Sequence, residues 1–201
     1  MSRQATTDFP VHELIARRWS PCGFSARPVL ASDLCSLFEA ARWAASSYNE
    51  QPWSYIVATR DNPDEFERML SCLVETNRDW AAAAPVLVIS VARLNFARNG
   101  RPNAAALHDL GLAAGNLSLE ATARGLSVHQ MIGISPETAR ELYEIPADAQ
   151  AVTAMAIGYA DDPENLSEAL RKRDLAPRTR KPITSFVFSG RWDEVSPIVA
   201  R

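Results

Sequence analysis

The polar run from Ser46 to Gln51 contains the densest group of hydrogen-bonding side chains whose spacing could do chemistry. Two serines, an asparagine and a glutamine fall within six positions, and hydroxyl and amide groups both donate and accept hydrogen bonds. A flat heterocycle with alternating donors and acceptors on its edge needs that mixture. Composition alone favours a simpler interpretation, in which the run is a helix-ending turn that Pro52 makes rigid.

Two groups of arginines could bind an anion. Arg17 and Arg18 are adjacent near the end of an expected helix, and Arg178 and Arg180 alternate in a segment with no helical period. Side chains two positions apart in an extended chain point the same way, so both could grip one phosphate. Each group taken alone is more typical of a basic helix end or of a solvated tail.

The tripeptide Met131-Ile132-Gly133 closes an expected strand. A glycine there lets a ligand approach the backbone closely, and its amide could then donate to a ring atom. The alternative is an ordinary strand-ending turn.

No other pattern predicts a metal or nucleophile site. The three histidines lack the helical i, i+4 spacing of a metal pair, and the chain has no GxSxG, GxGxxG or P-loop motif. The three cysteines have no CxxC spacing, which argues against a structural zinc site or a disulfide framework and favours a reducing compartment.

The bulk composition is that of an ordinary globular protein. Hydrophobic residues make up 47% and charged residues 22% of 201 residues, enough for one domain with a real core. A net charge of -3 gives no overall footprint for nucleic acid. The longest apolar run, 81–92, is too short for a membrane span, and the N-terminus lacks the apolar core of a signal peptide. We therefore expect a cytoplasmic protein with no nucleic-acid or membrane partner.

The elements that must position these segments alternate between helices and strands. Helical spacing and capping residues predict helices at 11–18, from a Ser32 cap to about Ala45, from Asn62-Pro63, at 103–124 with Gly125 as the stop, and at 136–143 after a Ser135 cap. Strands are expected at 53–59, 85–92, 127–131 and 151–157, the second of them buried on both faces. Asp161-Asp162 is expected to start a helix, and the chain after Pro182 has no firm period. The alternation argues for helices covering a sheet whose strand order stays open.

The order and spacing of these segments resemble the FMN-binding nitroreductase family from about Val11 to Trp192. The family pattern R-R-S-x-R-x-F is similar to the run Arg18–Phe24, and P-S-S-x-N-x-Q-P-W is similar to Ala45–Trp53. An A-P-V strand start, a D-L-G-x-A-x-x-N-L-x-L helix, an R-K-P segment and a later R-W have counterparts at 84–86, 109–119, 180–182 and 191–192. The serine-asparagine-glutamine-proline-tryptophan stretch is the most specific of these.

The resemblance implies an α+β fold with three layers, in which helices flank a mixed, mainly antiparallel sheet. It implies a single domain over 1–201 and an intertwined homodimer with FMN at the interface. The long helix from Asn103 would belong to that interface, and the tail from about 182 to 201 would pack on the partner subunit.

The resemblance also implies roles for individual residues. Arg18, Ser20, Arg178 and Arg180 would hold the FMN phosphate and ribityl chain. Ser46, Ser47 and Asn49 would lie at the flavin across a dimer interface, with Gln51 supporting their loop. Backbone amides of Ile132 and Gly133 would face the N5 and O4 edge, and Asn77 would hydrogen-bond the pyrimidine side. The complete expected cofactor site is Arg17, Arg18, Trp19, Ser20, Cys22, Ser46, Ser47, Tyr48, Asn49, Gln51, Asn77, Met131, Ile132, Gly133, Arg178 and Arg180.

The implied activity is ping-pong reduction with NAD(P)H as the reductant. NAD(P)H would give hydride to FMN N5 and leave, and a small electrophilic acceptor such as a nitroaromatic or a quinone would then take the electrons. No side chain is expected to be catalytic, because the flavin carries the chemistry. Segments 94–101 and beyond Asp161 would shape the acceptor pocket. The alternatives are a specialised flavin enzyme of this fold, such as a dehalogenase or dehydrogenase, and a non-catalytic flavin- or ligand-binding protein.

Two positions depart from the family pattern. Cys22 stands where the family usually has Arg or Lys, so one positive charge near the phosphate or the flavin N1–O2 edge is missing. A cation there stabilises reduced, anionic flavin, so its loss would lower the reduction potential. Trp19 replaces a usual basic or polar residue, and we expect weaker FMN affinity than is typical.

Overall fold

The centre of the fold is a four-stranded sheet. A computed structural model describes residues 3–200 of the chain. The strands pair in the order β1-β2-β4-β3, and all three pairings are antiparallel. Their bounds are β1 Trp53–Thr59, β2 Val86–Arg93, β3 Ser127–Met131 and β4 Ala149–Gly158. The expected α+β class is confirmed, while the expectation of a mixed sheet is wrong for these four strands.

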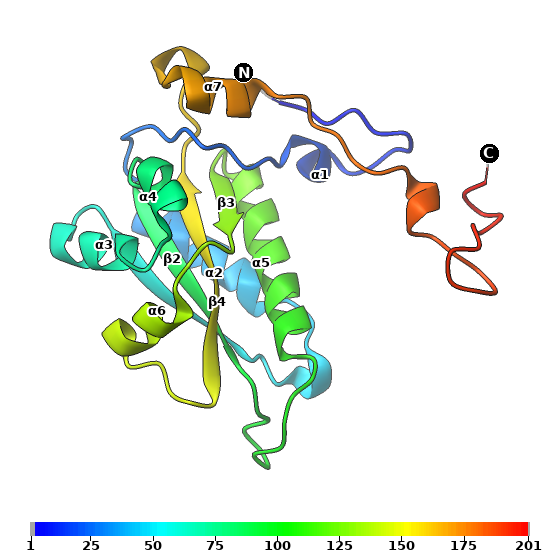
Figure 1. The fold of residues 1–201 in the computed structure, drawn as a ribbon, viewed down its shortest axis with the longest axis horizontal. Coiled ribbons are helices and arrows are strands. Elements are labelled where there is room, and N and C mark those ends of the chain that lie inside the picture. The colour runs from blue at the N-terminus through cyan, green and yellow to red at the C-terminus, as the bar shows by residue number, and fades with distance from the viewer. Residues whose placement is uncertain (1–2, 201) are drawn as a thin grey trace.

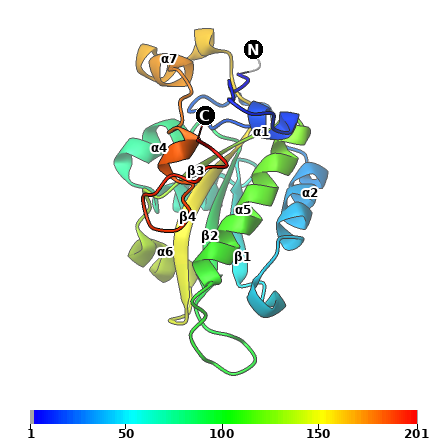
Figure 2. The same cartoon turned by 90° about the vertical axis from the view of Figure 1, so that its right-hand side faces the viewer.

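Helices cover both faces of the sheet (Figure 1). The two helices α2 and α5 pack on one face, and α3, α4 and α6 pack on the other (Figure 2). Their bounds are α1 Glu13–Arg17, α2 Ala31–Arg42, α3 Pro63–Leu70, α4 Glu75–Ala81, α5 Ala106–Ala123, α6 Pro136–Tyr143 and α7 Glu168–Leu175. Short 3₁₀ segments lie at Ser47–Asn49, Pro163–Asn165 and Ile183–Ser185. Within residues 3–200, no helix is both long and apolar enough to cross a lipid bilayer.

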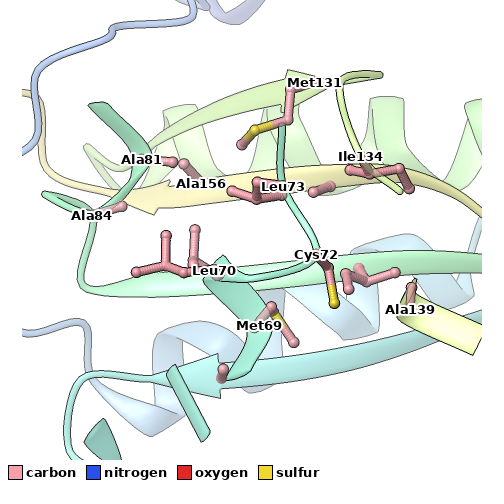
Figure 3. Packing of buried hydrophobic residues seen from close by; sticks show 14 of the residues in the cluster. Met69, Leu70, Cys72, Leu73, Ala81, Ala84, Met131, Ile134, Ala139 and Ala156 are labelled. Carbon is pink, nitrogen blue, oxygen red and sulfur yellow. The ribbon is translucent and has the colours of Figure 1, made fainter. Parts of the chain in front are cut away.

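Strand β2 separates two hydrophobic cores. Val86 and Val88 face α2 and α5, whereas Leu87 and Ile89 face the cluster between the sheet and the helices of the other side. That second cluster, with Met69, Leu70, Cys72 and Leu73 at its centre, is drawn in Figure 3. Apart from the buried Ser90 and the exposed Arg93 at its end, β2 is apolar, and burial on both faces explains this, as expected from the sequence.

Several predicted boundaries need correction. The prediction that Ser32 caps α2 is wrong, because the helix starts at Ala31 after an extended Leu30 that makes no side-chain cap. The same helix ends at Arg42 rather than near Ala45. Helix α5 begins at Ala106 rather than Asn103, because the Asn103 Oδ1 accepts from the Ala105 N–H at 3.1 Å and turns the chain first.

Other boundaries are confirmed. Strands 53–59 and 127–131 and helix 136–143 have the predicted bounds, and Asn62 and Ser135 accept hydrogen bonds as N-caps of α3 and α6.

The region after β4 differs from the prediction. Asp162 caps only a 3₁₀ turn, and α7 starts later, after a Ser167 cap. Helices α4 and α7 have no counterpart among the predicted elements.

The N-terminal segment and the stretch that follows α7 run beside each other, away from the sheet (Figure 1). The Arg178 guanidinium joins them, since it donates to the backbone carbonyls of Arg3, Ala16 at 3.0 Å and Arg18 at 2.6 Å. Beyond this cross-link the C-terminal segment extends from the body and exposes Phe186, Trp192 and Ile198.

The substitution Leu117→Ala should lower the free energy of unfolding by about 2 to 5 kcal/mol. Leu117 is fully buried between α5 and the sheet, so its truncation leaves a cavity. Leu30→Ala, at a side chain 62% exposed, should cost less than about 1 kcal/mol. Urea denaturation followed by circular dichroism measures both, and equal losses would contradict the core described above.

Candidate functional site

A pocket rich in arginine, called the basic pocket below, lies where the segment after α1, the end of α7 and residues 176–180 meet. Its volume is about 380 Å³. Its lining holds five arginines and a single carboxylate, in the set Arg3, Arg18, Trp19, Ser20, Cys22, His129, Arg173, Asp174, Ala176, Pro177, Arg178, Thr179 and Arg180. Six of the expected site residues thus come together from sequence positions some 160 residues apart. They are Arg18, Trp19, Ser20, Cys22, Arg178 and Arg180.

The arginines of the basic pocket repel one another. Burial lowers the pKa of Arg18, and the neighbouring Arg180 lowers it further. Burial also lowers the pKa of Arg178, with Arg18, Arg180 and Arg3 adding to the effect. An anion bound between such close, partly desolvated cations would stabilise them, because an opposite charge favours their charged forms. The Arg18 Nη1 donates to Ser20 Oγ at 3.2 Å, which adds a hydroxyl to the set.

Cys22 forms the floor of the basic pocket as a neutral thiol. It is 4% exposed, and burial, the largest cause, raises its pKa to about 11. Its Sγ lies 4.0 Å from the Nδ1 of His129, whose N–H donates to the Pro21 carbonyl at 2.7 Å. Burial lowers the pKa of His129, so this imidazole is neutral at pH 7. Neither side chain replaces the cation that the family pattern has here.

Arg17 points out of the basic pocket. It lines a separate cavity of about 730 Å³ together with Arg27 and Tyr159. Trp19 borders both cavities, and the Arg3 guanidinium lies 5.3 Å from the centre of its ring. The structure therefore separates Arg17 from the other expected site residues of this region.

The segment Ser46–Gln51, called the polar loop, has a strained backbone. Tyr48, Asn49 and Gln51 have φ of 54°, 55° and 51°, in the left-handed region that costs a residue with a side chain about 1 to 3 kcal/mol. Ser46 Oγ accepts from the Gln51 N–H at 3.1 Å, and Gln51 Nε2 donates to the Asn49 carbonyl at 3.2 Å. Gln51 makes these contacts within the loop, and Tyr48 and Asn49 are exposed.

Asp109 anchors the polar loop to α5. Its carboxylate is 2% exposed, and it accepts from the Ser47 N–H at 2.9 Å and lies 3.2 Å from the His108 Nδ1. A buried carboxylate needs such partners to offset its desolvation. On sequence grounds this aspartate was only part of a helix motif, and its contact with residue 47 depends on packing that no local pattern reveals.

The polar loop and the basic pocket lie at opposite ends of α5. The loop contacts Asp109 in the first turn of the helix, and α1 lies beside the last turns (Figure 2). Eighteen residues at 1.5 Å each span about 27 Å. The residues expected to surround one flavin therefore do not meet within a single chain.

The loop after β3 places a glycine at a tight contact. The Gly133 carbonyl accepts from the Val74 N–H and from Asn77 Nδ2, both at 3.1 Å. A Cβ on Gly133 would lie 2.3 Å from Asn77 Nδ2, so a larger residue would push this loop away. Ile132 is 85% exposed at the surface, while Met131 is buried in the core and offers no side chain to a ligand.

His129, Arg173 and Asp174 were not among the expected site residues. The histidine was considered only as a metal ligand, and α7 has no apolar period that predicts a docked helix. Asp174 pairs with residues 151 and 152 positions earlier in the chain, for which a single sequence contains no signal.

The fold matches that of a flavin-containing oxidoreductase of known structure. The chain is 31% identical to a solved structure described as an oxidoreductase containing FMN, covering 96% of this chain and 98% of that chain with a TM-score of 0.88. A nitroreductase family protein from Clostridium difficile 630 shares the fold at 20% identity, with 89% and 97% covered and a TM-score of 0.69.

Sequence comparison gives the family. The model of the nitroreductase family matches residues 15–159. An uncharacterized 15.4 kDa protein in the ask 5' region of Mycolicibacterium smegmatis is 30% identical over 132 residues, which are 66% of this chain and 88% of that protein. The chain belongs to the nitroreductase family.

Iodoacetamide at pH 8 should modify Cys35 and leave Cys22 and Cys72 unmodified in the folded protein. Cys35 is exposed and the other two thiols are buried. A pKa of about 11 leaves ~0.1% of the Cys22 thiol ionised at that pH, and the thiolate is the reacting form. Peptide mass spectrometry reads the labelling, with the denatured protein as the control in which all three react. Labelling of Cys22 as fast as Cys35 would contradict the neutral, buried thiol.

Proposed function

We propose that this protein is an FMN-dependent oxidoreductase that uses NAD(P)H to reduce a small electrophilic acceptor of the nitroaromatic or quinone type. The observation that carries the proposal is the basic pocket, a concentration of unneutralised arginines in a chain whose net charge is negative. When bound, FMN supplies the redox chemistry, taking hydride from NAD(P)H and passing electrons to the acceptor in ping-pong order.

The basic pocket fits the phosphate of FMN. Arg18 and Arg180 bring guanidinium groups whose mutual repulsion a phosphate dianion would relieve, and Ser20 adds a hydroxyl donor. Arg178 has a different part, because its donors already bind backbone carbonyls of the N-terminal region. We propose that it shapes the pocket and adds charge to it.

The loop after β3 fits the edge of the flavin ring. The Gly133 carbonyl is held by Val74 and Asn77, which fixes the orientation of the peptide units around it. The missing Cβ leaves room for the Asn77 and Val74 side chains behind the loop, and amides of Ile132 and Gly133 would donate to the N5 and O4 edge of the ring. The exposed Ile132 side chain then lies at the rim of the site.

We propose that the polar loop of a second copy completes each site. The outer face of α5 presents Leu107, Gly111, Leu112 and Gly115 to solvent, and nothing among the described residues lies within 4 Å of a Cβ at either glycine. Small residues and leucines at helical spacing suit close packing of two helices. The exposed aromatic tail beyond Pro182 would lie on the same partner. A homodimer then gives Ser46, Ser47 and Asn49 a flavin to bind.

The loop at 94–101 would border the acceptor pocket. It is joined to the polar loop, because Glu50 Oε1 accepts from the Ala97 N–H at 2.5 Å and the Arg98 guanidinium lies 4.4 Å from the ring centre of Tyr48. A change of sequence in this segment would therefore alter which acceptors enter without touching the basic pocket.

Purified protein should bind FMN, show the flavin absorption bands and bleach when NADH or NADPH is added without oxygen. Arg18→Gln should weaken FMN binding by at least about tenfold, because it removes one charge-assisted phosphate contact. Arg27→Gln is the matched control, since Arg27 lies outside the basic pocket over the Tyr159 ring. Fluorescence titration of flavin measures both affinities, and a wild-type protein that takes up no FMN would refute the proposal.

Gly111→Arg should yield a folded monomer with little FMN bound. The position is an exposed helical site at which a side chain meets no atom within the chain, so the fold should be kept while two α5 faces can no longer approach. Glu67→Arg on α3, an exposed helix site beyond the opposite face of the sheet, should stay dimeric. Analytical ultracentrifugation reports the mass. A Gly111→Arg dimer that binds FMN normally would argue against a site shared through this face.

A further inference from the structure

Helix α7 is docked on the segment that carries Cys22 through one buried carboxylate. Asp174 is 4% exposed, and its two oxygens accept from the Cys22 N–H at 2.8 Å and the Gly23 N–H at 3.1 Å. Residues 168–175 are mostly charged, and apart from Leu170, which packs against the hydrophobic core, no apolar stripe explains the position of this helix. Two charge-assisted hydrogen bonds to backbone amides therefore fix its last turn.

A second contact holds the start of the same segment. A Cβ on Gly23 would lie 2.4 Å from Leu166 Cδ2, so the leucine packs directly over the glycine backbone. The stretch 166–174 thus rests on Cys22 and Gly23 at both of its ends. The Asp174 contact involves Cys22, the position at which the usual cation of the family is absent, and the Leu166 contact involves the residue next to it.

This docking brings Arg173 into the basic pocket. Arg173 lines the pocket with Arg18, Arg180 and Cys22, although it comes from a different element. Its charge acts on the side chains of the pocket floor, since it lowers the pKa of His129 and opposes the larger, burial-driven rise in the pKa of Cys22. The side chain itself is exposed at the pocket rim, where a ligand can reach it.

We infer that Arg173, on α7 of the same chain, supplies the positive charge that position 22 lacks and binds the phosphate of FMN, with Asp174 as its positioning residue. The inference rests on the proposed flavin function. The cation then comes from α7 instead of from residue 22. The backbone amides of Cys22 and Gly23 hold that helix in place.

The experiment compares FMN with riboflavin, which lacks the phosphate, by fluorescence titration of three α7 variants and the wild type. Arg173→Gln should weaken FMN binding about tenfold and change riboflavin binding less than about twofold. Arg173→Lys should keep most of the FMN affinity, because it keeps the charge. Arg171→Gln is the matched control, an exposed arginine two residues away on the same helix that does not line the pocket, and it should bind both flavins as the wild type does.

Asp174→Asn tests the anchor. It should weaken FMN binding although it removes the single carboxylate of the pocket, because that carboxylate places the Arg173 guanidinium. The double variant should lose no more FMN affinity than Arg173→Gln alone. Circular dichroism establishes that each variant is folded. If Asp174→Asn does not fold, the Arg173 series decides the question without it.

Two results would overturn the inference while leaving the proposed function intact. One is an Arg173→Gln protein that binds FMN as tightly as the wild type, and the other is an equal loss of FMN and riboflavin affinity. A wild-type protein that binds neither flavin overturns the proposed function and this inference together.

Discussion

Helix α5 sets the distance between the two polar regions of this protein. Its first turn holds the polar loop through Asp109, and its last turns lie beside α1 and the basic pocket, about 27 Å away. The helix is pinned to the sheet by fully buried residues such as Leu117, so it cannot bend to bring its ends together. A ligand that needs both regions must take them from two chains, and the exposed face of α5 provides a surface on which the chains could meet.

Buried carboxylates fix both regions. Asp109 and Asp174 are each at least 96% covered, and both accept hydrogen bonds from backbone amides of a distant segment. Desolvating a carboxylate is costly, but hydrogen bonds to its charged form recover much of that cost and make the contact directional. Asp109 thereby stabilises a loop with three left-handed residues, and Asp174 holds a mostly charged helix. In each case the carboxylate orients other residues that are exposed to a ligand.

Charge in the basic pocket arises because chain folding brings the basic stretch 171–181 against arginines of the N-terminal region. Arg18 follows α1, Arg173 lies in the last turn of α7, and Arg180 lies in the C-terminal segment, which Arg178 ties to the N-terminal region. The repulsion among them is unfavourable within the chain and becomes favourable when an anion binds. Cys22 adds no charge, since burial keeps its thiol protonated.

The sequence by itself determined the elements and the family. Period-2 and period-3.6 patterns located β1, β3 and α6 with their observed bounds, because burial of one face of a strand or helix produces a regular apolar spacing along the chain. The spacing of the motifs identified the nitroreductase family. It could not place α4 or the start of α2, where no capping side chain marks the boundary, nor α7, which is mostly charged and has no apolar period although Ser167 caps it. Only the tertiary structure decided the strand order, the separation of Arg17 from Arg18, and the contacts of Asp109, Arg173 and Asp174. The carboxylate contacts join residues 62 to 152 positions apart, and the strand pairs also join separate segments of the chain. The physical reason is that hydrogen bonds and Coulomb forces follow distance in space, which a sequence does not record.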